Sequence, residues 1–372
     1  MYGGIGSLRL DDYEERLAVA TRGMNKDGEK PICIYPGSFC PPTYGHLEIV
    51  KKARVVFEKV YIICSVNPNK GRPWFTPEEC KALWQGYQLP ENVEVLTLAE
   101  FVAMGVEPKR IIMIRGLRGE CDAEDEKKVM MLNWQKYGIS QFYFIITDEA
   151  FVNVSSSAAR VAAEQCDVAK LAELVAPAVV TRLLEKTLNL KSLWLVVGQP
   201  GAGKSTGLRH LQKCRDDVVY INTDEFNHAL KPFLKKEFGE RDLAEVAIDQ
   251  PKELKRILAD KWLALLSHAL RGVKPRMNVF VEIGYGMRSE FRMWRFVGGR
   301  VLYVGMEDYA KLEERVKMRG TPEHTELIYS IPHVLNTAVI CQDEKMVLKV
   351  IDTDCSLKET ENRVEEFARQ IG

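Results

Sequence analysis

The chain has 372 residues, of which 46% are hydrophobic and 28% are charged, and Lys+Arg and Asp+Glu both number 52, so the formal net charge is zero. This length predicts two domains, each large enough to bury a core of its own. A neutral chain is atypical of proteins that clamp nucleic acid, so no nucleic-acid partner is expected.

The N-terminal residues, the apolar runs and the cysteine spacing indicate in which compartment the protein is expected. The first residues lack the apolar core of a signal peptide, and no apolar run reaches about 18 residues, so no membrane partner is expected. The nine cysteines are scattered and form no CxxC pair. This pattern predicts reduced thiols in a cytoplasmic protein, with neither a disulfide framework nor a zinc site.

In chain order, residues 1–30 are polar and are interpreted as an N-terminal extension with one short helix over 11–22. From residue 31, apolar strand-like runs alternate with segments of helical periodicity, which predicts a parallel sheet with helices on both faces. The predicted strands are 31–37, 59–67, 92–98, 110–118 and 141–147, and the predicted helices are 46–57, 76–87, 122–138 and 172–188.

A polar step at 186–192 separates this alternation from a second one. We place the domain boundary near residue 188, which gives an extension over 1–30 and domains over 31–188 and 189–372. The fold class is therefore α/β, with two doubly wound parallel sheets. The second domain's predicted strands are 192–198, 218–224, 278–284, 300–306 and 348–354, and its predicted helices include 308–320 and 356–372.

The turn after the first strand, YPGSFCPPTYGH over 35–46, is the first segment that suggests chemistry. Gly45 permits a close approach of the backbone to a ligand, and the N-terminus of the next helix attracts phosphate. Thr43 supplies a hydroxyl and His46 a donor. The same letters also fit a plain turn with a capping Thr and an incidental His, so both interpretations stay open for this motif alone.

Three further segments carry cations and hydroxyls just beyond predicted strands. Lys70 lies in NPNKGRPWFTPEE, Arg115 and Arg118 lie in RGLRGECDAEDE, and NVSSSAAR ends at Arg160. Ligands of open α/β sheets bind outside the carboxyl ends of the strands. The four segments together therefore predict a polyphosphate site.

With these motifs in this order, residues 31–188 resemble the phosphopantetheine adenylyltransferases of the HxGH nucleotidyltransferase superfamily, a Rossmann-like fold. The resemblance implies transfer of AMP from ATP to 4′-phosphopantetheine, with His46, Lys70 and Arg115 as catalytic residues. Ser38, Lys70 and Arg115 would hold the phosphopantetheine phosphate. ATP would contact Ser38, Phe39, Thr43, Gly45, His46, Arg118, Glu126, Ser155, Ser156, Ser157 and Arg160.

Cys40 departs from the family, which usually has Asp at this position. A thiol replaces neither the charge nor the hydrogen bonds of a carboxylate. The departure puts metal or substrate positioning at this corner in doubt. It does not forbid a reaction that needs mainly alignment and charge stabilisation.

The second domain carries GQPGAGKS over 198–205, a GxxxxGKS pattern between a predicted strand and a predicted helix. Such a loop cradles ATP phosphates with Gly198, Gly201, Gly203, Lys204, Ser205 and Thr206, and Ser205 also binds Mg²⁺. Asp224 ends the next strand and is expected to act on a substrate hydroxyl or on the metal, although an N-cap role would also suit it. Glu282 is a candidate distal metal ligand, and Arg315 and Arg319 are expected to form an ATP-binding lid.

This half resembles the P-loop small-molecule kinases, and its place after an adenylyltransferase resembles bifunctional coenzyme A synthase. The expected substrates are ATP, phosphopantetheine and the 3′-OH of dephospho-coenzyme A, with Mg²⁺ as cofactor. Other P-loop kinases, including the zeta-toxin type, fit equally well. The rivals are a nicotinamide-mononucleotide adenylyltransferase with a nicotinamide-riboside kinase, and a nucleotide-sensing regulator with one inactive domain. The sequence leaves the oligomeric state open, and a homo-oligomer is one of the alternatives.

Overall fold

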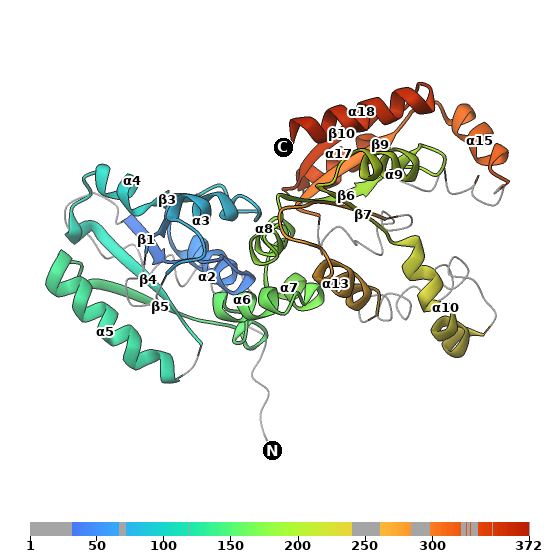
Figure 1. Ribbon diagram of the computed structural model, residues 1–372. Helices are drawn as coiled ribbons and strands as arrows, with labels where there is room; N and C mark the ends of the chain where they lie inside the picture. The colour runs from blue at the N-terminus through green and yellow to red at the C-terminus, as the bar shows by residue number, and fades with distance from the viewer. Residues whose placement is uncertain are drawn as a thin grey trace, which may run out of the picture. The chain divides into compact units, whose positions relative to one another are not determined.

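Two compact units make up the chain in the computed structural model, residues 1–158 and 159–372, and each contains one parallel sheet (Figure 1). The expected α/β class with two parallel sheets is confirmed. Along the chain, the boundary between the two units falls within a helix, after residue 158. The domain boundary expected near residue 188 stays a proposal. The structure describes residues 32–66, 72–118, 120–239, 261–283, 298–320, 325, 328, 334–343 and 345–371, and the expected extension over 1–30 and Lys70 lie outside them.

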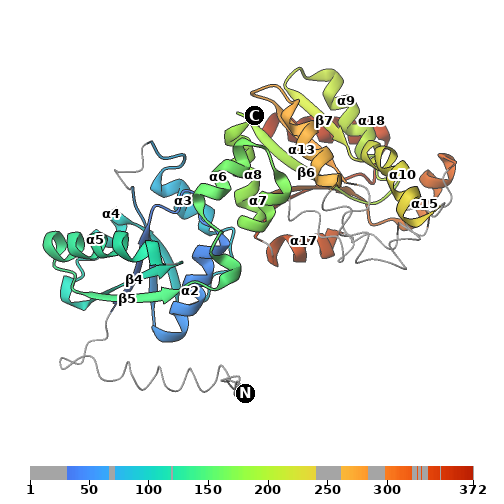
Figure 2. The same cartoon turned by 90° about the horizontal axis from the view of Figure 1, so that it is seen from below.

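The first sheet has the order β3-β2-β1-β4-β5, and all of its described pairings are parallel. Apolar, β-branched residues build its central strands, which suits strands that are covered on both faces. Figure 2 shows β4 and β5 side by side at one edge. The strands are β1 (Ile32–Gly37), β2 (Val60–Cys64), β3 (Val93–Thr97), β4 (Ile111–Leu117) and β5 (Gln141–Ile146).

Capping residues set the helix starts in this unit. Thr43, Thr76 and Thr97 each precede a helix and accept the backbone N–H three residues on, in capping boxes. The helices are α2 (Tyr44–Val56), α3 (Pro77–Trp84), α4 (Leu98–Ala103) and α5 (Glu120–Tyr137), with short 3₁₀ turns η2 (Pro108–Arg110) and η3 (Glu149–Phe151).

The two faces of the first sheet bury alternate residues of each strand. Ile34, Ile63 and Met113 pack on one face with Phe101 of α4. Gly116, of the opposite parity in β4, lies against Ile49 of α2. Helices therefore cover both faces, and the polar chemistry is confined to the strand ends.

The second sheet has the order β10-β9-β6-β8-β7, again with parallel pairings throughout the described strands. Its central strand β6 is buried along its whole length. The strands are β6 (Ser192–Val197), β7 (Val218–Asn222), β8 (Asn278–Glu282), β9 (Arg300–Gly305) and β10 (Val347–Asp352).

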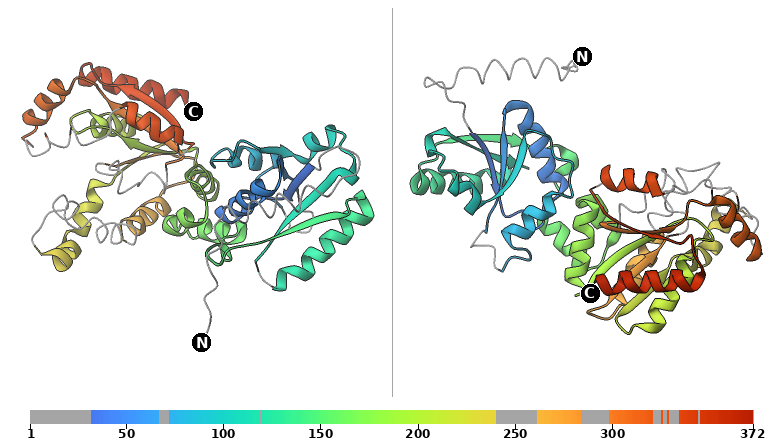
Figure 3. Two further views of the ribbon diagram at one scale, coloured as in Figure 1. Left: turned by 180° about the vertical axis from the view of Figure 1, so that it is seen from behind. Right: turned by 90° about the horizontal axis from the view of Figure 1, so that it is seen from above.

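Helices also surround the second sheet. Figures 1 and 3 show α18 (red) beside α9 (yellow-green), and the two helices contact one another. The helices are α6 (Ser156–Glu164), which begins in the first unit, α7 (Val168–Leu174), α8 (Pro177–Thr187), α9 (Lys204–Cys214), α10 (Asp224–Phe238), α13 (Leu263–Arg271), α15 (Tyr309–Met318), α17 (Val334–Asp343) and α18 (Leu357–Gln370).

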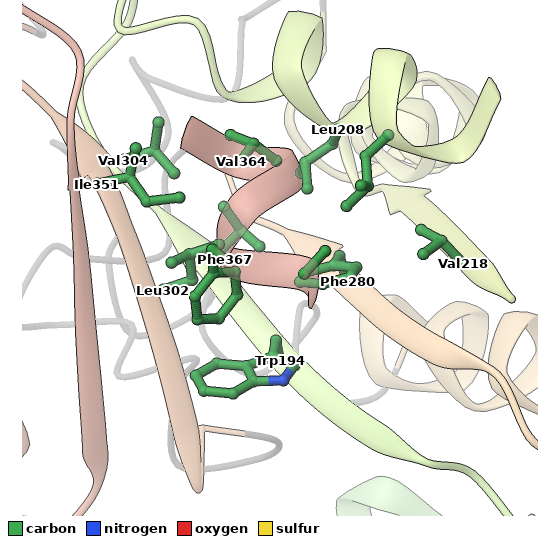
Figure 4. Close-up of a cluster of buried hydrophobic side chains, with 12 residues drawn as sticks. Trp194, Leu208, Val218, Phe280, Leu302, Val304, Ile351, Val364 and Phe367 are labelled. Carbon is green, nitrogen blue, oxygen red and sulfur yellow. The ribbon is translucent and has the colours of Figure 1, made fainter. Parts of the chain in front are cut away.

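One apolar cluster fills the space between the second sheet and the α9–α18 pair (Figure 4). Trp194 and Phe280 from the sheet and Phe367 from α18 form its aromatic centre, with the Trp194 and Phe367 rings 5.0 Å apart. Packing of this kind fixes the strand ends that carry the second site. In the described part of the chain, no helix combines the length and the apolar character that crossing a membrane requires.

Candidate active sites

The strand order of the first sheet has its switch point at the carboxyl ends of β1 and β4. β1 lies between β2 and β4, so the chain winds outward to β3 and then crosses to the other side. Ligands of open α/β sheets bind at such a switch point. The turn over 35–46 follows β1, and Arg115 lies near the end of β4.

His46 is the third residue of α2 and closes a capping box with Thr43. The Thr43 backbone N–H donates to Nδ1 of His46 over 3.1 Å, and the Thr43 hydroxyl lies 3.0 Å from the same nitrogen. The His46 N–H in turn donates to Thr43 Oγ1 over 3.4 Å. Since Nδ1 accepts the backbone N–H, the neutral ring carries its proton on Nε2. The capping role, one of the two that the sequence left open for this motif, uses Nδ1 and does not involve Nε2.

Aromatic side chains hold the His46 ring in place. Phe39 meets it edge-on with centroids 5.1 Å apart, and Trp84 lies 6.5 Å away. Phe39 is buried and has a φ of 43°, which a bulky residue rarely adopts. Backbone strain of this kind accumulates at functional sites.

The serine-rich segment lies against the same turn because position 45 lacks a side chain. A Cβ on Gly45 would lie 2.6 Å from the carbonyl oxygen of Val154. Ser156 Oγ donates to the Pro41 carbonyl over 2.7 Å, and Ser155 Oγ accepts the Ala158 N–H over 3.1 Å. The structure therefore brings together two segments that the sequence placed in one site.

Arg115 and Glu126 form a two-pronged ion pair between β4 and α5. Nε donates to Oε2 over 2.5 Å, Nη2 donates to Oε1 over 2.7 Å, and Nη1 donates to the Pro36 carbonyl over 2.9 Å. Burial disfavours the charge, but the hydrogen bonds and charge of Glu126 outweigh it and raise the pKa of Arg115. The sequence assigned these two residues to different ligands, whereas the structure pairs them.

The other expected residues of this site are less enclosed. Ser38 is half-buried after β1, Arg118 is exposed just beyond β4, and Ser157 is exposed on α6. Arg160 lies one turn further along α6 and is half-buried.

Cys40 occupies an interior corner that backbone groups and a second thiol surround. Its Sγ accepts the Phe75 N–H over 3.3 Å and lies 3.9 Å from the Phe75 carbonyl. A hydrogen bond with Cys40 raises the pKa of the Cys80 thiol, to which burial also contributes. Both thiols are at most 6% exposed. This corner suits a neutral thiol better than a carboxylate.

The GxxxxGKS loop of the second unit, residues 198–205, lies between β6 and α9, and Gly198 begins it with a φ of 146°. A Cβ there would lie 1.8 Å from the Val304 carbonyl oxygen, so only glycine fits. Lys204 is 8% exposed, and its Nζ donates to the carbonyls of Gly198 and Gln199 over 2.9 and 3.0 Å. The ammonium is thus held inside the curve of the loop.

Glu282, at the end of β8, accepts hydrogen bonds from three hydroxyl groups near this loop. Ser205 Oγ donates to Oε1 over 2.9 Å, and the Tyr220 hydroxyl donates to Oε2. Lys204 Nζ lies 3.8 Å from Oε1, and Thr223 Oγ1 donates to the Glu282 backbone carbonyl over 2.7 Å. Burial and the neighbouring carboxylate raise the pKa of Tyr220, so its hydroxyl remains a donor at neutral pH.

This donor set fits Mg²⁺. Ser205 and Glu282 offer hydroxyl and carboxylate oxygens, the ligands that Mg²⁺ prefers, and Glu282 is 5% exposed. Among the described residues, no three His, Cys, Asp or Glu side chains gather as in a closed metal cage. A nucleotide-bound Mg²⁺ needs only one or two protein oxygens, because phosphates and waters complete its shell.

Charges around Lys204 come from residues that the sequence singled out. Burial lowers the pKa of Lys204, the charges of Glu282 and Asp224 oppose this shift, and Arg319 adds to it. Asp224 is the first residue of α10, and the cap is Thr223, without a side-chain cap bond. The N-cap interpretation of Asp224 is therefore wrong.

Arg315 faces the segment between β10 and α18. Its Nη2 donates to the carbonyls of Thr353 and Cys355 over 3.3 and 2.7 Å. The two lid candidates thus differ in their surroundings, since Arg319 acts electrostatically on Lys204 and Arg315 binds backbone carbonyls.

Comparison with known proteins identifies the first site's family. Residues 34–173 match the cytidylyltransferase-like family. A phosphopantetheine adenylyltransferase of Corynebacterium efficiens is 36% identical over 130 residues, which cover 34% of this chain and 80% of that protein. Another, of Histophilus somni, is 33% identical over 155 residues, covering 41% and 96%. The chain belongs to the cytidylyltransferase-like family.

Membership in the cytidylyltransferase-like family makes the chain a nucleotidyltransferase homologous to phosphopantetheine adenylyltransferases, with ATP consistent as co-substrate. Both relatives align over 41% of this chain or less. A solved structure of a NadR protein in complex with NR aligns over 91% of this chain and 96% of that chain, with 15% identity and a TM-score of 0.30.

Sequence reasoning missed three residues of these sites. Tyr220 lies inside the apolar run VVYIN, where a tyrosine looks like any core residue. Gln199 is fully buried, with its Oε1 accepting the Tyr303 hydroxyl over 2.7 Å, yet it occupies a variable position of the GxxxxGKS pattern. Cys80 lies on an ordinary amphipathic helix, and only the fold brings it to Cys40.

Proposed function

We propose that the first domain transfers AMP from ATP to 4′-phosphopantetheine and that the second phosphorylates the 3′-OH of the dephospho-coenzyme A so formed. The carrying observation is the Thr43–His46 turn beside the serine segment, in a domain homologous to phosphopantetheine adenylyltransferases. The P-loop with Lys204, Ser205 and Glu282 supports the kinase half.

In the adenylyl transfer, a phosphate oxygen of phosphopantetheine attacks the α-phosphorus of ATP, and pyrophosphate leaves. The attacking group is already a nucleophile, so the residues contribute alignment and charge stabilisation. His46 would donate from Nε2 to the phosphate charge that grows in the transition state. Thr43 supports this role because it keeps the proton on that nitrogen.

Arg115 would hold the phosphate of phosphopantetheine, together with Ser38 and Lys70. Of the five N–H donors of a guanidinium, Glu126 and Pro36 take three. Two donors then serve the substrate, and the Glu126 carboxylate fixes their direction.

In the kinase reaction, Lys204 and the loop amides would bind the β- and γ-phosphates, and Ser205 and Glu282 would hold Mg²⁺, which neutralises phosphate charge when bound. Asp224 would accept the proton of the substrate hydroxyl. Its charge acts on Lys204, which supports a place for Asp224 near the phosphate-binding loop. Arg319 would add positive charge at the transferred phosphoryl group.

A substrate panel tests both halves at once. The full chain is incubated with ATP, Mg²⁺ and one of phosphopantetheine, dephospho-coenzyme A, nicotinamide mononucleotide or nicotinamide riboside, and products are identified by mass. We expect dephospho-coenzyme A and then coenzyme A from phosphopantetheine. Products from the nicotinamide compounds alone would replace this proposal with the rival pair. Arrest at dephospho-coenzyme A would refute the kinase substrate and leave the first half standing.

A further inference from the structure

Tyr220 and Glu282 lie on the same face of the second sheet. β7 and β8 are parallel neighbours with Asn222 opposite Glu282 and Tyr220 opposite Phe280. Opposed residues of parallel strands share a face, and so do residues two apart in one strand. The register therefore sets the Tyr220 ring beside the Glu282 carboxylate, on the side where α9 carries Ser205.

The two oxygens of the Glu282 carboxylate have different donors. Oε1 receives the Ser205 hydroxyl over 2.9 Å, and Oε2 receives the Tyr220 hydroxyl. A carboxylate bound at only one oxygen can turn about its last torsion, whose potential is broad. Two donors from two elements fix that torsion and hence the direction of both oxygens.

We propose that Tyr220 is a positioning residue of the magnesium site, whose hydroxyl holds Glu282 so that its other oxygen stays beside Ser205. The inference rests on the proposed kinase function, because that function supplies the reason for a metal at Ser205 and Glu282. Partners that orient a ligand typically change metal affinity by about 10- to 100-fold when they are removed.

The ring and the hydroxyl of Tyr220 have separable tasks. The ring packs at the margin of the apolar cluster around Trp194 and Phe280. Phenylalanine would preserve that packing and remove only the hydroxyl, with its hydrogen bonds to Glu282 and Ser205. Tyr220→Phe thus tests the hydroxyl and not the core.

Tyr303→Phe is a matched control in the same sheet. It also removes a tyrosine hydroxyl, one that donates to Gln199 Oε1 over 2.7 Å, but no bond to Glu282. Any change that follows merely from losing an internal hydroxyl near the P-loop should appear in both variants.

The experiment measures ADP binding to the full chain by calorimetry, first with EDTA and then with saturating Mg²⁺. Binding that disappears in Lys204→Ala belongs to the second domain. We expect the ADP affinity of Tyr220→Phe to match that of wild type in EDTA. The factor by which Mg²⁺ raises this affinity should be about 10-fold smaller in Tyr220→Phe than in wild type. Tyr303→Phe should keep the wild-type ratio between the two conditions.

A full Mg²⁺ gain in Tyr220→Phe would overturn the inference. Absence of any Lys204-dependent, Mg²⁺-enhanced binding in wild type would instead overturn the proposed kinase function. If Tyr220→Phe lowers the Tm, a double-mutant cycle with Glu282→Gln decides between the two explanations. The double variant should then lose less of the Mg²⁺-dependent increase in ADP affinity than the sum of the two single losses. Additive losses would mean that Tyr220 acts only through the stability of the fold.

Discussion

The Thr43 backbone N–H donates to Nδ1 of His46 over 3.1 Å, so the N-cap residue of α2 also fixes which imidazole nitrogen carries the proton. Under the proposed function, one side chain would then serve both as part of a helix cap and as a phosphate donor. The two roles can be separated, because Asn reaches the position of Nδ1 but not that of Nε2.

His46→Asn should therefore keep the cap and lose adenylyl transfer. Removal of one donor aimed at transition-state charge costs about 10²–10³ in kcat. The measurement is pyrophosphate release from ATP and phosphopantetheine, beside a thermal unfolding curve. A variant with wild-type Tm and a kcat within about twofold of wild type would refute the donor role of Nε2.

Cys40→Asp tests whether the surroundings of residue 40 are adapted to a thiol. The new carboxylate would accept the Phe75 N–H but would also face the Phe75 carbonyl in a site that is 6% exposed. An imperfectly paired buried polar group costs about 1–3 kcal/mol, so we expect a lower Tm and no gain in adenylyl transfer. Cys40→Ser, which keeps a donor and an acceptor, is the matched control and should lower the Tm less. A faster, stable Cys40→Asp variant would show that the thiol has no role of its own.

Glu126→Gln should weaken the site around Arg115. The change removes the charge that holds the guanidinium, and hydrogen bonds to charged groups are worth about 1.5–3 kcal/mol. We expect a higher KM for phosphopantetheine together with a lower Tm. Glu94→Gln provides the comparison, since Glu94 pairs with Lys59 at an exposed surface and should change neither quantity noticeably. Equal effects of the two substitutions would contradict an organising role for Glu126.

Lys204→Ala and Asp224→Asn should separate nucleotide binding from phosphoryl transfer. The first removes the cation that the loop holds and that would bind the phosphates, so nucleotide affinity and turnover should both fall. The second should leave nucleotide affinity intact and stop turnover, because the acid acts on the hydroxyl or the metal. With phosphopantetheine and ATP, both should accumulate dephospho-coenzyme A. Asp216→Asn, an exposed neighbour of β7, is the control and should proceed to coenzyme A.

Asp217 should make the second unit sensitive to acid. Arg215 donates to it over 2.8 and 2.9 Å and Lys191 over 2.7 Å, and these bonds hold the pKa of Asp217 below its ordinary value of 3.8. A carboxyl whose folded pKa is lowered stabilises the fold above the unfolded pKa and loses that effect as the pH falls through the folded one. The Tm gap between wild type and Asp217→Asn should be largest near pH 7 and should shrink below about pH 4. A gap that is independent of pH would mean that the charge of Asp217 contributes nothing.

Sequence patterns predicted the sheets because the strands are short apolar runs between turn residues. Ser192–Val197 and Val60–Cys64 are of this kind, and the alternation with helices implied parallel pairing. Helix α4 escaped prediction because six residues are too few to show a period. Helix α13 lies in a stretch for which no element was assigned, although its apolar residues repeat at helical spacing.

Site residues were predictable where a motif has its own local geometry. The GxxxxGKS loop and the Thr43–His46 turn are contiguous segments, so their residue order already defines a local shape. Pairs across elements were not predictable. Arg115 and Glu126 meet only because β4 and α5 lie together, and Tyr220 reaches Glu282 only through the register of β7 and β8.

The bond from Ser156 to the Pro41 carbonyl spans 115 positions of the chain. Contacts between such distant segments require closure of a long loop, so they form late relative to local turns and helices. The close approach at Gly45 has the same consequence, because Val154 arrives only with the last part of the domain. A growing chain that ends before residue 154 would have every strand of the first sheet but only half of the proposed nucleotide site. ATP affinity in the first domain should therefore appear abruptly on the completion of folding, and nucleotide would stabilise the finished domain rather than guide its assembly.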